Sequence, residues 1–351
     1  MISSFNILSI GPEYIFPKGG IAQCVATYKE KIFKDFRYIA NSCSDSVLKK
    51  AIKMLVSVLQ FSSLLLWDKR IRIVHIHTAS NNSFRRSAFF VRIAKVMGRK
   101  VIMHIHGGGF KDYYDANKVY VYRVLSRCEA IVTLSYSWKE FFQNNVGIQN
   151  VFVIPNVISE PILKNVTSDG MFHLLYLGHI CKAKGIFDLV ELLHNCHNEY
   201  AGKLVLDIGG GMYEEEELRT FIKDNKLENL ISFHGWVSGS KKNDLLNKAD
   251  AFILPSYTEG VPISILEAES YGLPILSTNV GGIPEIVSNG QNGFLFHPGL
   301  KNEMKDAIDK LLKDSNLCAK MGDRSRQIVL DNLPNSVEDK LKKMYKIVLN
   351  K

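Results

Sequence analysis

Short apolar runs alternate with longer helix-compatible stretches along most of this chain. Runs of this length and composition are typical of strands that are buried on both faces of a parallel sheet. The predicted strands are residues 5–10, 71–77, 101–105, 130–134, 151–154, 172–177, 204–208, 231–233, 251–254 and 274–277. Strand–helix alternation of this kind builds doubly wound sheets. We therefore predict an α/β fold with two Rossmann-like domains, whose loops at the carboxyl ends of the strands line one cleft.

The length of 351 residues is sufficient for two domains. Residues 155–170 are polar and rich in turn formers, which predicts a linker between domains at 1–160 and 171–335. With 46% hydrophobic and 23% charged residues the chain has the composition of a globular protein, and we expect neither a membrane-spanning helix nor a signal peptide. Six scattered cysteines without a C-x-x-C pair fit a reducing cytoplasm and argue against a disulfide framework and a structural zinc site.

Positive charge is concentrated in the first half of the chain. Residues 1–165 hold 23 Lys+Arg against 10 Asp+Glu, whereas residues 166–351 hold 21 against 25. An apolar stretch at 46–67 is flanked by lysines and arginines, and a second basic helix is predicted at 85–100. The two stretches fit docking on an anionic bilayer surface, and they equally fit ordinary Rossmann helices with a solvated basic face.

Glu259 and Glu267 lie on either side of a predicted helix start, since Glu259 follows the strand at 251–254 and the helix covers 263–271. The first turn of a helix has free N–H groups and partial positive charge, which favour a phosphate. A carboxylate in the preceding loop can accept hydrogen bonds from sugar hydroxyls, and one within the helix can hold the two hydroxyls of a ribose. The pattern predicts a site for a nucleotide with a sugar attached.

The segment 255–296 resembles the signature of the retaining nucleotide-sugar glycosyltransferases of family 4. The match runs through E-G-V-P-I-S-I-L-E-A at 259–268, G-L-P-I at 272–275, G-G-I-P-E at 281–285 and N-G-F-L at 292–295. The resemblance implies the GT-B fold, with a helix at 336–351 that crosses back to the first domain. It also implies that the substrate-binding residues next to Glu259 are Gly260, Val261, Pro262, Ile263 and Ser264, with backbone N–H groups of the segment 261–264 facing the donor phosphates.

Other loops match the same family less strongly. Lys184-Gly185 matches a turn whose basic residues neutralise the diphosphate, although His179 stands where the family usually has arginine. His106 follows a strand, where the family places a histidine near the donor sugar. The remaining donor-binding residues that the resemblance implies are Gly19 and Gly20 after the first strand, Gly209 and Gly210 after the strand at 204–208, and Trp236 beside the base.

The resemblance implies retaining transfer of a sugar from a UDP- or GDP-linked donor to a glycan or lipid-linked glycan, in bacterial surface polysaccharide biosynthesis. The implied catalytic residues are His106, Lys184 and Glu259, with Glu267 on the ribose. No D-x-D motif is suitably placed, so we expect no metal or other cofactor. We expect a cytoplasmic protein, peripheral on the membrane, that does not bind nucleic acid. A nucleotide-sugar 2-epimerase and a non-catalytic sugar-nucleotide binding protein remain alternatives.

Overall fold

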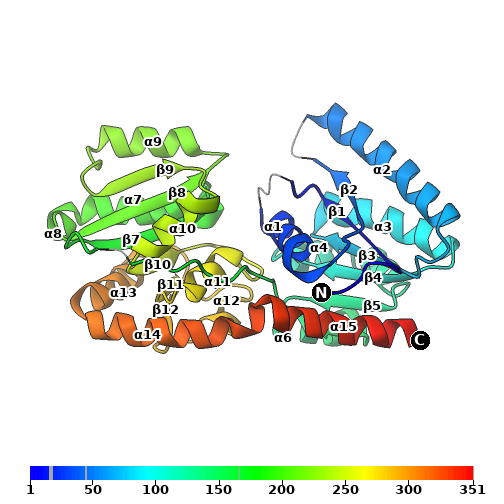
Figure 1. Cartoon of the computed structure of the whole chain (residues 1–351). Coiled ribbons are helices and arrows are strands. Elements are labelled where there is room, and N and C mark those ends of the chain that lie inside the picture. The colour runs from blue at the N-terminus through cyan, green and yellow to red at the C-terminus, as the bar shows by residue number, and fades with distance from the viewer. Residues whose placement is uncertain (16–18, 44–45, 166, 351) are drawn as a thin grey trace. The chain divides into compact units, whose positions relative to one another are not determined.

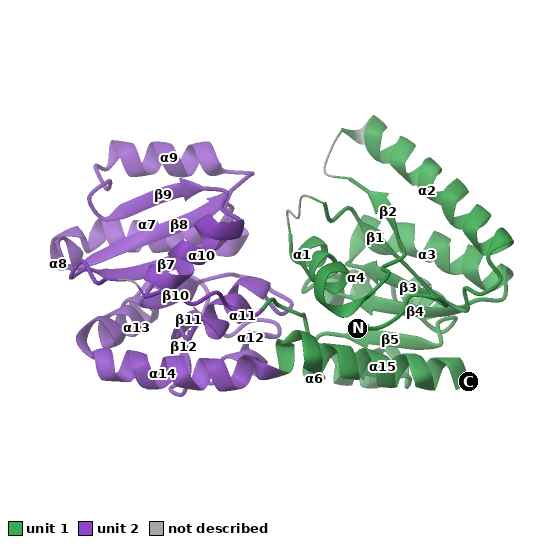
Figure 2. Cartoon of the chain, in the orientation of Figure 1, with its two compact units in different colours: residues 1–159, 331–351 green, residues 160–330 purple. Residues whose placement is uncertain are grey.

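The computed structural model describes residues 1–15, 19–43, 46–165 and 167–350. They form two compact units, which Figure 2 distinguishes by colour. Unit 1 consists of Met1–Ser159 with Asp331–Lys351, and unit 2 of Glu160–Leu330. Each unit contains a six-stranded parallel sheet covered by helices (Figure 1). The predicted α/β class with two doubly wound sheets is confirmed.

Unit 1 has the strand order β2-β1-β3-β4-β5-β6. The strands are β1 (Ile7–Pro12), β2 (Tyr38–Ser42), β3 (Ile73–Thr78), β4 (Lys100–Ile105), β5 (Ala130–Thr133) and β6 (Val151–Val153). The helical segments are α1 (Gly20–Thr27), η1 (Tyr28–Ile32), α2 (Val47–Trp67), α3 (Asn81–Val96), α4 (Phe110–Ala116), α5 (Lys118–Leu125), α6 (Tyr136–Glu140), η2 (Phe141–Val146) and α15 (Pro334–Asn350).

The two faces of the unit 1 sheet differ in chemistry because side chains alternate along a strand. Val74 and Met103 lie in the apolar core that contains residues of α2 and α3. His75 lies on the opposite face, where its Nδ1 is 2.6 Å from the hydroxyl of Tyr345 in α15. Lys100 holds the end of the same helix by donating to the carbonyl groups of Val348 and Leu349. The last helix is therefore an integral part of unit 1.

Helix α2 packs on unit 1 through one side only. Phe61 and Leu65 are fully buried, and the Phe61 ring meets Phe90 of α3 edge to face at 5.2 Å between centroids. The window Leu48–Trp67 is nevertheless only 17% buried, and by length and composition alone it could cross a membrane. The sequence predicted no membrane-spanning helix, yet this segment is long and apolar enough to be a candidate, because its lysines lie at one end and leave a long apolar remainder.

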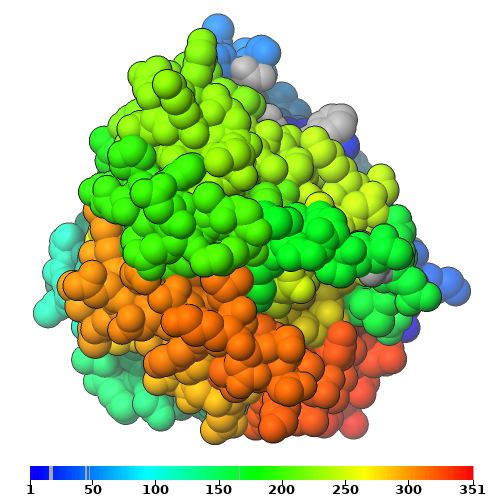
Figure 3. All heavy atoms as spheres, turned by 90° about the vertical axis from the view of Figure 1, so that its left-hand side faces the viewer, coloured from blue at the N-terminus to red at the C-terminus, as the bar shows by residue number. Residues whose placement is uncertain are grey.

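Unit 2 has the strand order β12-β11-β10-β7-β8-β9. Its strands are β7 (Phe172–His179), β8 (Leu204–Gly211), β9 (Ile231–Gly235), β10 (Ala251–Leu254), β11 (Ile275–Thr278) and β12 (Gly293–Phe296). Its helical segments are η3 (Lys182–Lys184), α7 (Ile186–Asn195), α8 (His197–Tyr200), α9 (Glu215–Asp224), α10 (Gly239–Lys248), α11 (Ile263–Ser270), α12 (Ile283–Ile286), α13 (Lys301–Lys313) and α14 (Ser315–Ile328), followed by η4 (Val329–Asn332) at the boundary between the units. In Figure 3 the atoms of α13 and α14, coloured orange, lie on the face that is turned toward the viewer.

The order of strands in unit 2 creates a topological switch point between β7 and β10. The chain leaves β7 toward β8 on one side and later returns to β10 on the other side. Loops that follow two such neighbouring strands diverge to opposite faces, and ligands of open parallel sheets bind in the crevice between them. The loop after β7 contains Lys184, and the loop after β10 contains Glu259.

All ten predicted strands are present, with ends shifted by up to three residues. The strand predicted at 5–10 begins at Ile7, because Phe5 is exposed. The strands β2 and β12 were not predicted. Both lie at sheet edges, where one side has no neighbouring strand and short, mixed sequences are tolerated.

We predict that Phe61→Ala lowers the free energy of unfolding by about 3–5 kcal/mol, because it empties a buried aromatic site between α2 and α3. Trp67→Ala on the same helix is the matched control. Its side chain is 86% exposed, so the change should be within about 0.5 kcal/mol. Urea unfolding followed by circular dichroism measures both, and equal losses would contradict this packing of α2.

Candidate functional site

Glu259 and Lys184 form an ion pair at the switch point of unit 2. The Lys184 ammonium donates to Oε1 of Glu259 over 2.5 Å, and the Ser256 hydroxyl donates to the same oxygen over 2.8 Å. Glu259 is 9% exposed, whereas the Lys184 side chain is 26% exposed. A buried carboxylate needs such partners because an unpaired charge in the interior is costly. The ammonium is therefore oriented, and it still reaches solvent.

The loops after β7 and β10 are fixed to each other by their backbones. The Tyr257 N–H donates to the Ala183 carbonyl over 2.9 Å. Gly185 has a φ of 69°, and a Cβ at this position would lie 1.9 Å from the carbonyl oxygen of Pro255. Only glycine accepts both this backbone conformation and this approach. The Lys184–Glu259 geometry is thus set by the loops and does not depend on the two flexible side chains alone.

A second close approach holds the Glu259 loop from the other side. Gly281 has a φ of 56°, and its Cβ would lie 1.9 Å from the Glu259 carbonyl oxygen. The N–H of Gly282 donates to the Gly260 carbonyl over 2.7 Å. Val261, Pro262 and Ile263 are buried, while Gly260 and Ser264 remain partly exposed. The predicted phosphate-facing segment is therefore a rigid loop that leads into the first turn of α11.

Glu267 lies one turn into α11, as predicted. Its Oε1 accepts a hydrogen bond from the Lys242 ammonium of α10 over 2.6 Å, and its side chain is 16% exposed. Lys242 could not be predicted as part of the site, since a lysine on a polar helix has the same sequence pattern as a solvated one. We refer to Lys184, Ser256, Glu259 and Glu267 as the switch-point site.

His179 borders the switch-point site at the end of β7. Its ring centroid lies 5.4 Å from that of Tyr213 and 5.6 Å from that of Trp236. Burial lowers the pKa of His179, the nearby charge of Lys184 lowers it further, and Glu259 partly opposes both effects. The imidazole is therefore mainly neutral at pH 7. Trp236 is 41% exposed and offers a flat apolar face beside it.

Two predicted glycines of unit 2 are tightly packed within the protein. A Cβ on Gly210 would lie 2.2 Å from the Gly178 carbonyl oxygen, and one on Gly209 would contact Leu177 and Val237. Both residues are buried in β8. Their small size lets β7 and β8 approach the loop after β9, which includes Trp236.

In unit 1, His106 directly follows β4. Its Nε2 lies 3.1 Å from Nδ1 of His77, and its ring stacks on His104 with centroids 4.0 Å apart. Burial lowers the pKa of His106 to about 4, although a hydrogen bond with Asn156 opposes this effect. The side chain is thus a neutral hydrogen-bonding group at pH 7, oriented by His77.

His75, His77 and His104 lie behind His106, and one ring nitrogen of each lies within 4.8 Å of the others. Burial lowers the pKa of all three, so neutral rings are available. Their rings are stacked or tilted against one another, however, and the Nδ1 of His75 is already bonded to Tyr345. Metal independence remains a prediction.

Gly19 and Gly20 lie at the start of α1, whereas Pro17 and Lys18 of the same motif lie outside the described residues. Gly19 has a φ of 136° and nothing within 4 Å of a Cβ, so its backbone borders open space. It also accepts the Gln23 N–H through its carbonyl group. This glycine can therefore bring a loop backbone close to a ligand.

Two family models match adjoining parts of the chain, namely Glycosyltransferase Family 4 over residues 39–160 and Glycosyl transferases group 1 over residues 162–328. These matches, together with the two parallel sheets, place the chain in a class of enzymes that transfer sugars. The chain belongs to the glycosyltransferases of the GT-B fold.

Two curated proteins illustrate the relationship. An uncharacterized glycosyltransferase of Haemophilus influenzae is 28% identical over 58% of this chain and 58% of its own length. A UDP-Gal:alpha-D-GlcNAc-diphosphoundecaprenol alpha-1,3-galactosyltransferase of Escherichia coli is 25% identical over 90% of this chain and 84% of its own. The first three curated relatives are matched over only 58%, 40% and 34% of their lengths.

Among solved structures, HepE of Anabaena in complex with UDP and glucose superimposes with a TM-score of 0.77. The match covers 97% of this chain and 99% of that one at 16% identity. This likeness establishes the fold.

We predict that Gly281→Ala displaces the Glu259 loop, because its Cβ would overlap the Glu259 carbonyl oxygen. Gly290→Ala is the matched control, since Gly290 has a φ of 78° with nothing within 4 Å. Gly290→Ala should lower the free energy of unfolding by only about 1–2 kcal/mol, which is the cost of a left-handed backbone conformation for a residue with a Cβ. Gly281→Ala should lose more stability and also nucleotide affinity. Urea unfolding and calorimetric titration decide, and equal behaviour of the two variants would refute the proposed packing.

Proposed function

We propose that the protein transfers a sugar from a nucleoside diphosphate sugar to a hydroxyl of a glycan or lipid-linked glycan, with retention of the anomeric configuration. The observation that carries the proposal is the switch-point site. Lys184 is paired with Glu259 in the loop before α11, and Glu267 lies one turn into that helix, so a cation, a helix start and two carboxylates are available within unit 2. UDP is the favoured nucleotide, because the Escherichia coli relative uses UDP-Gal and HepE was solved with UDP.

In this proposal Lys184 and the first-turn N–H groups of α11 stabilise the departing diphosphate. The diphosphate itself takes the proton of the acceptor hydroxyl. Glu259 binds hydroxyls of the donor sugar, and Glu267 binds the ribose. These positive groups of the chain make a metal unnecessary.

In this proposal His106 and the loop at Gly19 and Gly20, all in unit 1, have the donor-binding roles that the family resemblance implies. A neutral imidazole can exchange hydrogen bonds with a sugar hydroxyl, and the His77 contact fixes its orientation. We extend the proposal to a glycan or lipid-linked acceptor and to surface polysaccharide synthesis at the cytoplasmic face of the membrane. The names of two relatives and the basic character of the first half of the chain support this extension.

The test of the reaction is an assay of UDP-sugars with and without lipid-linked or free glycan acceptors. Release of UDP that requires an acceptor, with an α-linked product from an α-linked donor by NMR, supports retaining transfer. Rapid release of UDP with water alone and epimerised sugar would indicate a 2-epimerase. Tight UDP binding without turnover of any donor would indicate a binding protein.

We predict that Glu267→Ala weakens binding of UDP by roughly 1–3 kcal/mol, the scale for losing a partner of buried hydroxyls. Glu259→Ala should weaken binding of the UDP-sugar and leave UDP nearly unchanged, because its partner is the sugar. Calorimetric titration of both variants with both ligands is the measurement. Equal losses in all four combinations would rule out this division of roles.

We predict that UDP affinity falls as pH rises from 6 to 8. In the free protein the His179 pKa is lowered, whereas a bound diphosphate favours the imidazolium and raises it. Binding therefore takes up a proton between the two pKa values, and the affinity declines with pH across that window. His179→Arg should remove most of this dependence, since guanidinium stays charged. Parallel curves for the two proteins would show that His179 points away from the phosphates.

A further inference from the structure

The outer side of α2 exposes a continuous apolar stripe. Its seven large members are 51–86% exposed, namely Leu48, Ile52, Leu55, Val56, Leu59, Leu66 and Trp67. Steps of three, four and seven residues place them on one face of a helix. Single exposed leucines are ordinary on a protein surface, but a stripe along a 21-residue helix is not. Figure 1 shows α2 along the outside of unit 1, with α3 beneath it.

Basic residues surround this stripe. Residues 46–111 contain 13 Lys+Arg and one acidic residue, Asp68. Lys49 and Lys50 are exposed at the start of α2. The adjacent helix α3 presents Arg85, Phe89, Arg92 and Val96 to solvent, which repeats the combination of positive and apolar side chains. This pairing of charge and apolar surface complements an anionic lipid interface, where acyl chains meet negatively charged headgroups.

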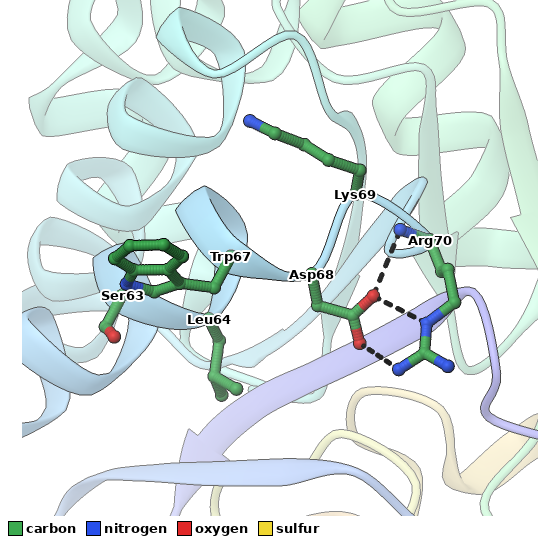
Figure 4. A pocket seen from close by; sticks show the side chains of 6 residues that line it. All are labelled: Ser63, Leu64, Trp67, Asp68, Lys69 and Arg70. Atoms are coloured by element: carbon green, nitrogen blue, oxygen red, sulfur yellow. Dashed lines mark hydrogen bonds and ion pairs between the residues drawn. The ribbon is translucent and has the colours of Figure 1, made fainter.

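The carboxyl end of α2 also combines an exposed apolar side chain with basic residues. A surface hollow of ≈ 410 Å³ there is lined in part by Trp67, Lys69 and Arg70 (Figure 4). Arg70 is bonded to Asp68 through Nε and a terminal nitrogen, and the Lys69 side chain extends away from that pair. An exposed tryptophan next to a lysine is the combination that membrane proteins place at headgroup level.

The packing of α2 determines how it would meet a membrane. Phe61 and Leu65 are fixed in the core of unit 1, and the Arg99 guanidinium donates to the Leu65 carbonyl over 2.7 Å. A spanning orientation would remove α2 from the sheet and expose the core partners of Phe61. An orientation in the plane of the interface keeps these contacts and buries only the stripe.

We infer that α2 docks unit 1 on an anionic phospholipid surface, with its axis in the membrane plane and the stripe toward the acyl chains. This docking does not depend on the transfer reaction, because the stripe lies in unit 1 and the switch-point site in unit 2.

The test is binding of the full chain to vesicles of phosphatidylglycerol and phosphatidylcholine, compared with phosphatidylcholine alone, by flotation at low and high salt. The expected result is binding to the anionic vesicles that weakens with salt. Leu55→Glu with Leu59→Glu should abolish it, whereas Leu163→Glu, a residue of similar exposure in unit 2, should not.

Replacing Lys49, Lys50 and Lys53 by Gln should reduce binding by roughly fivefold for each charge removed. The same change at Lys223, Lys226 and Lys320 should have little effect.

Trp67 provides a direct probe. Its fluorescence should shift to shorter wavelength on anionic vesicles, and Trp67→Phe should remove the shift although two other tryptophans remain. The circular dichroism spectrum and the urea unfolding midpoint report that each variant is folded, because α2 lies in unit 1 and a nucleotide bound to unit 2 would not detect its loss. Absence of binding by the parent protein, or binding unchanged in the Leu55/Leu59 variant, would overturn the inference. A dimer in sedimentation velocity that the Leu55/Leu59 change dissociates, without vesicle binding, would assign the stripe to a second copy of the chain instead.

Discussion

The adjacency of β7 and β10 in one parallel sheet is the constraint on which the site depends. It brings Lys184 and Glu259, which are 75 residues apart, to the same edge. The remaining contacts refine this placement. Gly185 lets the first loop approach Pro255, and Gly281 lets a third loop approach Glu259. A side chain at either glycine would overlap a backbone carbonyl group, so the site tolerates little variation in its framework.

The ion pair has a further role before any ligand binds. Glu259 is nearly buried, and Lys184 and Ser256 satisfy one of its oxygens. Glu267 is likewise engaged by Lys242. Each carboxylate proposed to bind the donor is thus already paired with a lysine of the protein. Ligand binding would exchange these hydrogen bonds within the protein for hydrogen bonds to the ligand. The net gain in binding free energy is then moderate, and each side chain is already oriented before the ligand arrives.

Much of this architecture could be predicted from the sequence, because strands buried on both faces are recognisable as short apolar runs. Glu259 and Glu267 were predicted from a long motif at 255–296, and Lys184 from a shorter match in the loop after another strand. Lys242 and Ser256 were not, since their roles depend on packing between elements. The edge strands β2 and β12 were missed because their side chains lack the continuous apolar pattern. The exposure of α2 was not decidable from composition, because apolar helices of the same length also occur in protein cores.

Unit 1 is discontinuous in sequence, and this affects how the chain folds during synthesis. Residues 160–330 are contiguous, so unit 2 has all its strands once the ribosome has released them. The first sheet must wait for α15, which supplies Tyr345 to His75 and two carbonyl groups to Lys100. Until then the histidines and apolar side chains beneath that helix lack its cover. The sheet of unit 1 is therefore completed only after the whole of unit 2 has been synthesised.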